Sequence, residues 1–236
     1  MKLLRSIIFF PLLCALVAGA PVSAAIVGGE TATEVMPALM PGPARAVALF
    51  LSGDAGWSGS LGRASVQQLR AAGIAVIGLD SRQFFNRPRS AAEVAAWLDG
   101  PAAREGYVHL PLILIGQSFG ADALLPVLPA LPAGIAQRLR GVALLVPGTE
   151  RYPEVSLGEF LGLGRGIDNR AAGQAAAARL PLLCVQGAEE PDSLCPILSG
   201  PGVERVTLPG GHMLRRDDKT IGRVLTAWAT RVLAGP

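Results

Sequence analysis

Short apolar runs, separated by polar and glycine-rich turns, recur along the chain and predict the strands of a parallel sheet. Most of these runs are rich in β-branched residues and apolar nearly throughout, which is typical of strands buried on both faces. Residues with helical spacing fill most of the intervals, so strands and helices alternate. We expect strands at residues 46–51, 74–79, 112–115, 142–146, 182–186 and 205–208, and helices at 61–72, 90–97, 121–128, 171–179 and 220–233.

This alternation predicts an α/β fold, with a mostly parallel sheet and helices on both faces, in a single domain over residues 45–236. Residues 25–44 hold prolines and small residues and are predicted to be an irregular lead-in. Residues 147–178 interrupt the alternation between the fourth and fifth strands. That stretch is either a cap insertion over the site or a plain long connection.

One predicted strand runs directly into a motif that carries chemistry. Residues 112–115 are followed by Gly116-Gln117-Ser118-Phe119-Gly120 and then by an Ala- and Leu-rich helical stretch. A strand, G-x-S-x-G and a helix are the context of a nucleophile elbow, in which the serine projects from a very tight turn. Ser118 is therefore the candidate nucleophile, although an ordinary strand-to-helix turn with Ser118 as N-cap would give the same pattern.

A serine nucleophile needs a base, and the base needs an acid that orients it. Of the two histidines, His109 precedes the elbow strand and would lie at the wrong end of the sheet, whereas His212 follows the last strand in a Gly-rich loop. We expect His212 to be the base. Three carboxylates follow the fifth strand, between the serine and the histidine in chain order; we favour Asp192 over Glu190 and rank Glu189 third.

An oxyanion hole requires two N–H donors, one from the residue after the nucleophile and one from the turn after an earlier strand. Phe119 supplies the first donor. The turn after residues 46–51 is glycine-rich, so the N–H of Asp54 or Ala55 is expected to supply the second. Asp122, in the first turn of the following helix, is interpreted as structural.

The first 24 residues are typical of a cleavable secretory signal. Lys2 and Arg5 precede an apolar run over residues 7–20, and small residues stand at 22 and 24, so we expect cleavage after Ala24. No later segment is long and apolar enough to span a bilayer, so no membrane span is predicted after cleavage. Two cysteines then remain, Cys184 and Cys195. In an exported chain they are expected to form a disulfide, the alternative being two reduced thiols in the core.

Charge and motif content exclude several classes of function. The full chain carries 21 basic and 18 acidic side chains, but two of the basic ones lie in the signal, which leaves a net charge of +1. We therefore predict no nucleic-acid partner. There is no His/Cys spacing typical of a metal site, no phosphate-binding loop and no dinucleotide fingerprint, so neither a metal nor a cofactor is predicted.

Taken together, these motifs resemble the α/β-hydrolase superfamily and, more narrowly, the VirJ/AcvB family of bacterial virulence-associated periplasmic proteins. From its length we expect the shorter, single-domain VirJ-like form. The matching stretches are Leu51-Ser52-Gly53-Asp54-Ala55-Gly56-Trp57, Gly116-Gln117-Ser118-Phe119-Gly120-Ala121-Asp122, the segment from Cys184 to Cys195, and Pro209-Gly210-Gly211-His212.

The resemblance implies a periplasmic serine hydrolase that removes lysine or another amino acid from aminoacyl-phosphatidylglycerol, and a link of the shorter members to type IV secretion. Gln117 and Met213 stand where the family is expected to have tyrosine or a similar residue and a second histidine. These departures concern substrate identity more than the triad. The alternatives are a periplasmic esterase or peptidase of other specificity, and a non-catalytic adaptor for secretion substrates.

A lipid ester at the membrane surface would fit the loop that follows the second predicted strand. We expect its basic residues to meet a lipid phosphate, and the neighbouring aromatic residues to contact acyl chain or membrane. The alternatives are a solvated basic loop and ordinary core packing. The residues concerned are Arg82, Arg87 and Arg89, and Trp57, Phe84 and Phe85.

Overall fold

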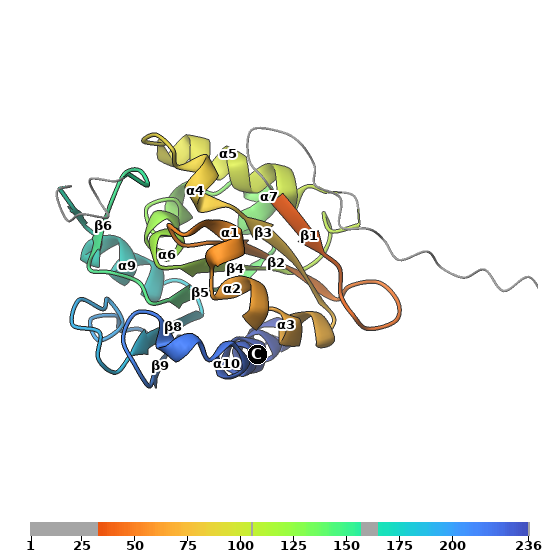
Figure 1. Ribbon diagram of the computed structural model, residues 1–236. Helices are drawn as coiled ribbons and strands as arrows, with labels where there is room; N and C mark the ends of the chain where they lie inside the picture. Colours follow the sequence, from red (N-terminus) through yellow and green to blue (C-terminus); the bar gives the residue numbers. More distant parts are fainter. Residues whose placement is uncertain (1–32, 105, 157–164, 236) are drawn as a thin grey trace, which may run out of the picture.

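The computed structural model describes residues 33–104, 106–156 and 165–235, and its strands form one long twisted sheet with a small hairpin beside it (Figure 1). The predicted signal, residues 1–24, lies outside the described residues. The sheet has the order β1-β3-β2-β4-β5-β8-β9, and all its pairs are parallel except β1–β3. Its strands are β1 (Thr33–Met36), β2 (Ala46–Leu51), β3 (Ile74–Leu79), β4 (Leu112–Gln117), β5 (Leu139–Leu145), β8 (Leu182–Gly187) and β9 (Val203–Leu208).

Helices cover both faces of this sheet, with α5 and α7 on one side and α3 and α10 on the other (Figure 1). This confirms the α/β architecture that the alternation of patterns predicts. The described helices are α1 (Gly56–Gly59), α2 (Gly62–Ser65), α3 (Gln67–Ala71), α4 (Ser81–Phe84), α5 (Ala91–Ala102), α6 (Phe119–Leu124), α7 (Ala133–Ala136), α9 (Arg170–Ala177) and α10 (Asp218–Ala234), with short 3₁₀ turns at Leu128–Ala130 and Leu214–Arg216.

The central strands serve two separate cores because successive side chains point to opposite faces. In β4, Leu112 and Leu114 pack with Val94 and Leu98 of α5, whereas Ile113 and Ile115 belong to the core on the α10 side. Every residue of β2, β3 and β4 is buried. The apolar runs are therefore continuous because both faces of each strand are covered.

The structure differs from the sequence-based expectation at several places, two of which lie before β3. Residues 33–36, predicted to be irregular, form β1, which pairs antiparallel with β3 at the edge of the sheet. The helix predicted over residues 61–72 is divided at Val66 into α2 and α3. At the end of α2 the Ser65 hydroxyl donates to the carbonyl of Gly62, a local hydrogen bond that competes with a continuous helix.

The stretch 147–178 contains a short antiparallel hairpin, β6 (Glu150–Arg151) with β7 (Ile167–Asp168), followed by α9. Asp122 of α6 anchors this stretch: its Oδ1 accepts from the N–H of Gly148 at 2.9 Å and from Asn169 Nδ2 at 3.2 Å. The hairpin therefore lies against the helix that starts at the elbow. Residues 157–164 lie outside the described part of the chain, and a cap over the site stays a prediction.

Candidate active site

Ser118 occupies a strained turn between β4 and α6, as the elbow pattern predicts. Its backbone has φ 50° and ψ −122°, a conformation that residues with side chains seldom adopt. The flanking glycines are required by space, because a Cβ on Gly116 would lie 2.5 Å from the backbone of α6, and one on Gly120 would lie 2.4 Å from a carbonyl oxygen at the end of β2. The strain therefore persists because the surrounding backbone leaves Ser118 no other conformation.

His212 and Glu190 complete a linear relay with Ser118. The Ser118 Oγ lies 2.7 Å from His212 Nε2, and His212 Nδ1 lies 2.5 Å from Glu190 Oε1. Glu190 is held from its other side as well, because its Oε2 accepts from the N–H of Gly187 at 3.2 Å. With Nδ1 protonated, the imidazole donates to Glu190 and its Nε2 accepts the serine hydroxyl proton, the arrangement that a general base requires.

Glu190 and His212 differ in exposure. The Glu190 side chain is 8% exposed, whereas that of His212 is 49% exposed. The Glu190 carboxylate is thus shielded and doubly hydrogen-bonded, while the imidazole of His212 is open to solvent. Such shielding strengthens the hydrogen bond that orients the imidazole.

The preference for Asp192 as the acid is corrected by this geometry. Asp192 is exposed, and its carbonyl accepts from the N–H of Thr149, while the N–H of Leu194 donates to Pro147. The disulfide between Cys184 and Cys195 is present, as predicted. These hydrogen bonds, together with the bridge to β8, hold the end of the turn beside residues 147–149, on the β5 side of β8 and so away from His212, which follows β9.

Glu190 reaches His212 because the first part of the same turn pairs with the other neighbour. The N–H of Ala188 donates to Leu208, and the N–H of Glu189 donates to Gly210, at 2.8 and 3.0 Å. A Cβ on Gly187 would lie 2.4 Å from the Gly210 carbonyl, so the two loops are in close contact. The Glu189 side chain points elsewhere and is 69% exposed, 3.8 Å from the guanidinium of Arg215.

The loop that carries His212 has an unusual backbone immediately after the histidine. Leu214, Arg215 and Arg216 all have positive φ, at 46°, 52° and 53°. Each such residue costs about 1–2 kcal/mol relative to the right-handed conformation. Hydrogen bonds from Leu214 to Gly211 and from Arg216 to Met213 hold the turn. Sequence reasoning did not find this turn, since none of its three residues is a glycine.

The turn that is expected to supply the second oxyanion donor lies beside Ser118. A Cβ on Gly53 would be 3.4 Å from the Cβ of Ser118, which brings the turn after β2 next to the elbow. Within the described residues, no hydrogen bond occupies the N–H of Phe119, Asp54 or Ala55. These donors are therefore free to meet negative charge that develops on a substrate oxygen.

Asp80, which the sequence analysis did not single out, holds this turn in place. Its buried carboxylate accepts from the N–H of Trp57 and from that of Gln83, each at 3.1 Å. Next to it, the N–H of Ser81 donates to the hydroxyl of Ser52 at 3.0 Å. Asp80 and Ser81, at the start of α4, thus hold the turn after β2 at both of its ends, Trp57 and Ser52. Asp80 directly follows β3, and this position at the carboxyl end of a strand is the sequence signal that could have identified it.

The aromatic residues expected at the substrate are instead parts of the core. Trp57 is 5% exposed, packs edge-on against Phe50 and donates to Glu34 through its indole N–H. Phe84 is 7% exposed and stacks on Trp97 with ring centroids 4.0 Å apart. Trp57 fills space against β2, and Phe84 fills space against α5, so each ring contributes buried apolar area to the core.

The neighbouring Phe85 is also buried, and its ring lies 5.0 Å from that of Phe119, so it borders the elbow. Of the basic residues in the same loop, Arg82 is exposed and Arg87 pairs with Glu93 at 2.7 Å. Backbone and side-chain hydrogen bonds from Ser90, together with Arg87, lower the pKa of Glu93 to about 2. The structure thus brings together Ser118, His212 and Glu190 and leaves Trp57, Phe84, Arg82 and Arg87 outside the relay.

A predominantly parallel sheet, a strained serine after its central strand and a histidine–carboxylate pair after the last two strands define the α/β-hydrolase fold. The chain belongs to the VirJ family, because the family model described as "Bacterial virulence protein (VirJ)" matches residues 45–232. No curated protein matches the chain.

Solved structures with the same fold include several proteins titled as esterases or hydrolases. The esterase domain of a Rhodothermus marinus protein is 22% identical, with a TM-score of 0.61 over 85% of this chain and 92% of that one. Est1E from Butyrivibrio proteoclasticus is 11% identical, with a TM-score of 0.63 over 86% and 95%. XC6422 from Xanthomonas campestris, titled a serine hydrolase without lid, is 16% identical, with a TM-score of 0.57 over 90% and 96%. These identities support a shared fold.

Proposed function

We propose that this protein is a serine hydrolase, an esterase in which Ser118, His212 and Glu190 form the catalytic triad. The observation that carries the proposal is the continuous relay from Ser118 Oγ through the imidazole to Glu190, with distances of 2.7 and 2.5 Å. A fold alone does not imply an activity, but a nucleophile, base and acid in hydrogen-bonding sequence is the arrangement that acyl transfer needs.

In the proposed reaction, Ser118 Oγ attacks the ester carbonyl while His212 Nε2 takes the hydroxyl proton. Glu190 stabilises the imidazolium without taking the proton itself. The N–H of Phe119 and that of Asp54 or Ala55 bind the oxyanion of the tetrahedral intermediate. His212 then gives the proton to the leaving alcohol, and water, activated by the same histidine, releases the acid from Ser118.

For the substrate, we propose aminoacyl-phosphatidylglycerol, from which the enzyme removes lysine or another amino acid. Membership of the VirJ family supports this choice, together with the chemistry, since the amino acid is joined to the lipid glycerol by an ordinary ester. The predicted signal at residues 1–24 and the disulfide are in keeping with a periplasmic site of action. No helix in the described part of the chain is long and apolar enough to cross a bilayer.

The test is hydrolysis by the purified mature chain, residues 25–236, of lysyl- and alanyl-phosphatidylglycerol in detergent micelles, with the released amino acid measured by mass spectrometry. We expect release by the wild type and a loss of several orders of magnitude in Ser118→Ala. Release from simple esters but not from these lipids would indicate an esterase of other specificity. Equal activity of Ser118→Ala and wild type would refute the triad, whereas no activity on any ester would favour the non-catalytic adaptor.

A further inference from the structure

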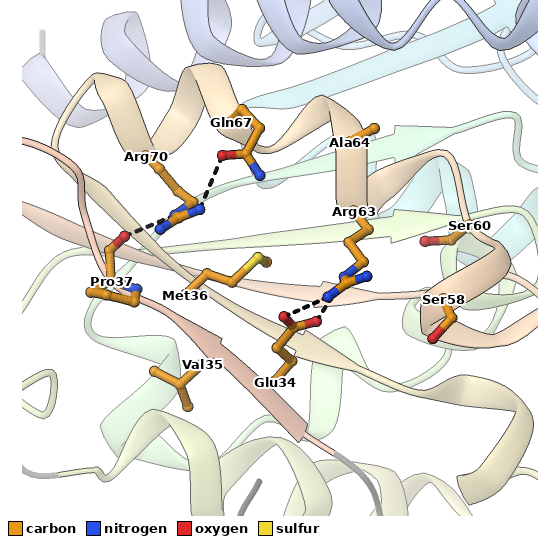
Figure 2. A pocket seen from close by; sticks show the side chains of 10 residues that line it. All are labelled: Glu34, Val35, Met36, Pro37, Ser58, Ser60, Arg63, Ala64, Gln67 and Arg70. Atoms are coloured by element: carbon orange, nitrogen blue, oxygen red, sulfur yellow. Dashed lines mark hydrogen bonds and ion pairs between the residues drawn. The ribbon is translucent and has the colours of Figure 1, made fainter. Parts of the chain in front are cut away.

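Two cavities outside the relay each contain a pair of arginines, and they differ in how those charges are used. The first, with a volume of 530 Å³, lies between β1 and the α2–α3 segment (Figure 2). There Arg63 donates twice to Glu34, at 3.0 and 3.1 Å, and Arg70 donates to the Pro37 carbonyl and to Gln67 (Figure 2). Both guanidinium groups are occupied by the protein itself, so this cavity offers little to a ligand.

The second cavity, with a volume of 270 Å³, lies where the start of α5, helix α6 and strand β6 meet. Its apolar wall includes Phe85, Val94 and Val127, while Arg89 and Arg151 supply positive charge. Tyr152 also lines it, and its phenol can donate a hydrogen bond. We call it the α5–β6 cavity.

Arg89 is held in a fixed orientation at this cavity. Its Nε donates to the carbonyl of Phe84 at 2.8 Å, its guanidinium carbon lies 4.4 Å from the centroid of the Phe84 ring, and its side chain is 12% exposed. Glu93 is the nearby carboxylate, 3.5 Å from Arg89 Nη1. That carboxylate is already engaged by Arg87 and by Ser90, so it only partly neutralises Arg89.

Arg151 is available for a ligand. It lies on β6 of the hairpin and is half-buried, and within the described residues no hydrogen bond or ion pair occupies its guanidinium. Two guanidinium groups beside a phenol and an apolar wall suit an oxyanion attached to a short carbon chain. A phosphate fits well, because guanidinium forks bind phosphate oxygens in pairs.

The α5–β6 cavity lies close to the proposed nucleophile. Phe85 lines the cavity, and the same ring packs on Phe119, the residue after Ser118, with centroids 5.0 Å apart. The carbonyl of Phe85 also accepts from the N–H of Val155, which ties the loop to the hairpin. A substrate whose ester lies at Ser118 would have to extend past both of these rings to reach the cavity.

We infer that the α5–β6 cavity binds a phosphate group of the substrate whose ester Ser118 cleaves, with Arg89 and Arg151 as its ligands. This inference rests on the proposed function and adds a specificity site to it. Of the three loop arginines in the sequence-based expectation it retains Arg89, whereas Arg82 and Arg87 do not line the cavity.

The test compares two water-soluble esters that differ by a phosphoglycerol unit: alanyl-glycerol, which has no phosphate, and alanyl-glycerophosphoglycerol. We expect Arg151→Gln to lower kcat/KM for the phosphate-containing ester roughly ten- to a hundredfold, mainly through KM, as removal of one charge-assisted contact would. Hydrolysis of alanyl-glycerol should be unchanged. Arg82→Gln is the matched control, an exposed arginine of the same region, and should affect neither ester.

A third arm uses alanyl-phosphatidylglycerol in micelles. If Arg151→Gln impairs this lipid but neither soluble ester, the phosphate is recognised as part of a lipid. Arg89→Gln should repeat the pattern, and thermal unfolding will show whether loss of its contact with Phe84 affects folding. An equal loss on both soluble esters, or no loss on any phosphate-containing substrate, would overturn the inference.

Binding measured without turnover separates the inference from the proposed function. Glycerophosphoglycerol should bind to Ser118→Ala protein in calorimetry at millimolar concentration, and more weakly after the further change Arg151→Gln. Absence of binding would refute the phosphate site even if esters are hydrolysed. Binding with no hydrolysis by the wild type would refute the esterase and leave the site in place.

Discussion

At the scale of single residues, the site depends on which of three neighbouring carboxylates meets His212. Glu189, Glu190 and Asp192 lie within four positions of one another and look equivalent as local sequence. Glu190 is the one that is shielded from water and hydrogen-bonded by both His212 and the N–H of Gly187. Its neighbours are exposed and make no hydrogen bond to the imidazole among the described residues.

Glu190→Gln is therefore expected to lower kcat by about 10⁴, because the amide favours the wrong imidazole tautomer and no longer stabilises the imidazolium. The fold should remain intact. Asp192→Asn is the matched control, an acid of the same turn, and should stay close to wild type. Steady-state kinetics on a simple ester would decide, and the reverse pattern in the two variants would restore Asp192 as the acid.

At the scale of elements, the elbow requires three backbone segments to pass within contact distance. Gly116 faces the backbone of α6, and Gly120 faces the carbonyl oxygens that end β2. Neither glycine has a positive φ, so what excludes a side chain is space rather than conformation. Helix α6 can therefore lie this close to β4 and to the end of β2 only because residues 116 and 120 carry no Cβ.

Gly120→Ala should destabilise the protein by at least about 1–3 kcal/mol, because its Cβ would lie 2.4 Å from a backbone oxygen that cannot easily move. Gly134→Ala on α7 is the control, since nothing lies within 4 Å of its Cβ, and a helical alanine should stabilise by about 0.5–1 kcal/mol. The measurement is urea unfolding followed by circular dichroism. A Gly120→Ala protein as stable as wild type would refute the packing argument.

At the scale of the whole molecule, the disulfide joins β8 to the turn that carries Glu190. Cys184 and Cys195 are both buried and are separated by 11 positions, and Glu190 lies between them. The bridge limits how far this loop can open when the rest of the chain unfolds. It therefore contributes to global stability and restricts the acid at the same time.

Replacing both cysteines by alanine should lower the free energy of unfolding by about 2–3 kcal/mol, the loop-closure entropy of a short loop. Activity at moderate temperature should fall less than in Glu190→Gln, since the hydrogen bonds of Glu190 persist. Denaturant unfolding and ester kinetics measure the two effects. In the unreduced wild type, thiol titration should find no free thiol in the mature chain, and two reactive thiols would contradict the bridge.

The sequence by itself determined the six parallel strands in the described part of the sheet and the elbow at Ser118, because these features are local. The apolar run at residues 46–51 became β2 with the same bounds, and the G-x-S-x-G spacing around Ser118 became the elbow. Chain order was enough to separate His212 from His109. A strand buried on both faces and a turn with no room for side chains each leave a direct record in the residues that form them.

Only the tertiary structure decided which carboxylate faces His212 and where the loop side chains lie. Glu190 faces His212 because its turn pairs with the loop after β9, while the part of the turn that holds Asp192 pairs with residues 147–149 after β5. Likewise, Trp57 is buried in part by β1, whose Glu34 lies 23 positions away in sequence and accepts from the indole N–H. Such choices depend on which backbone lies alongside in space, and no local pattern of residues records that pairing.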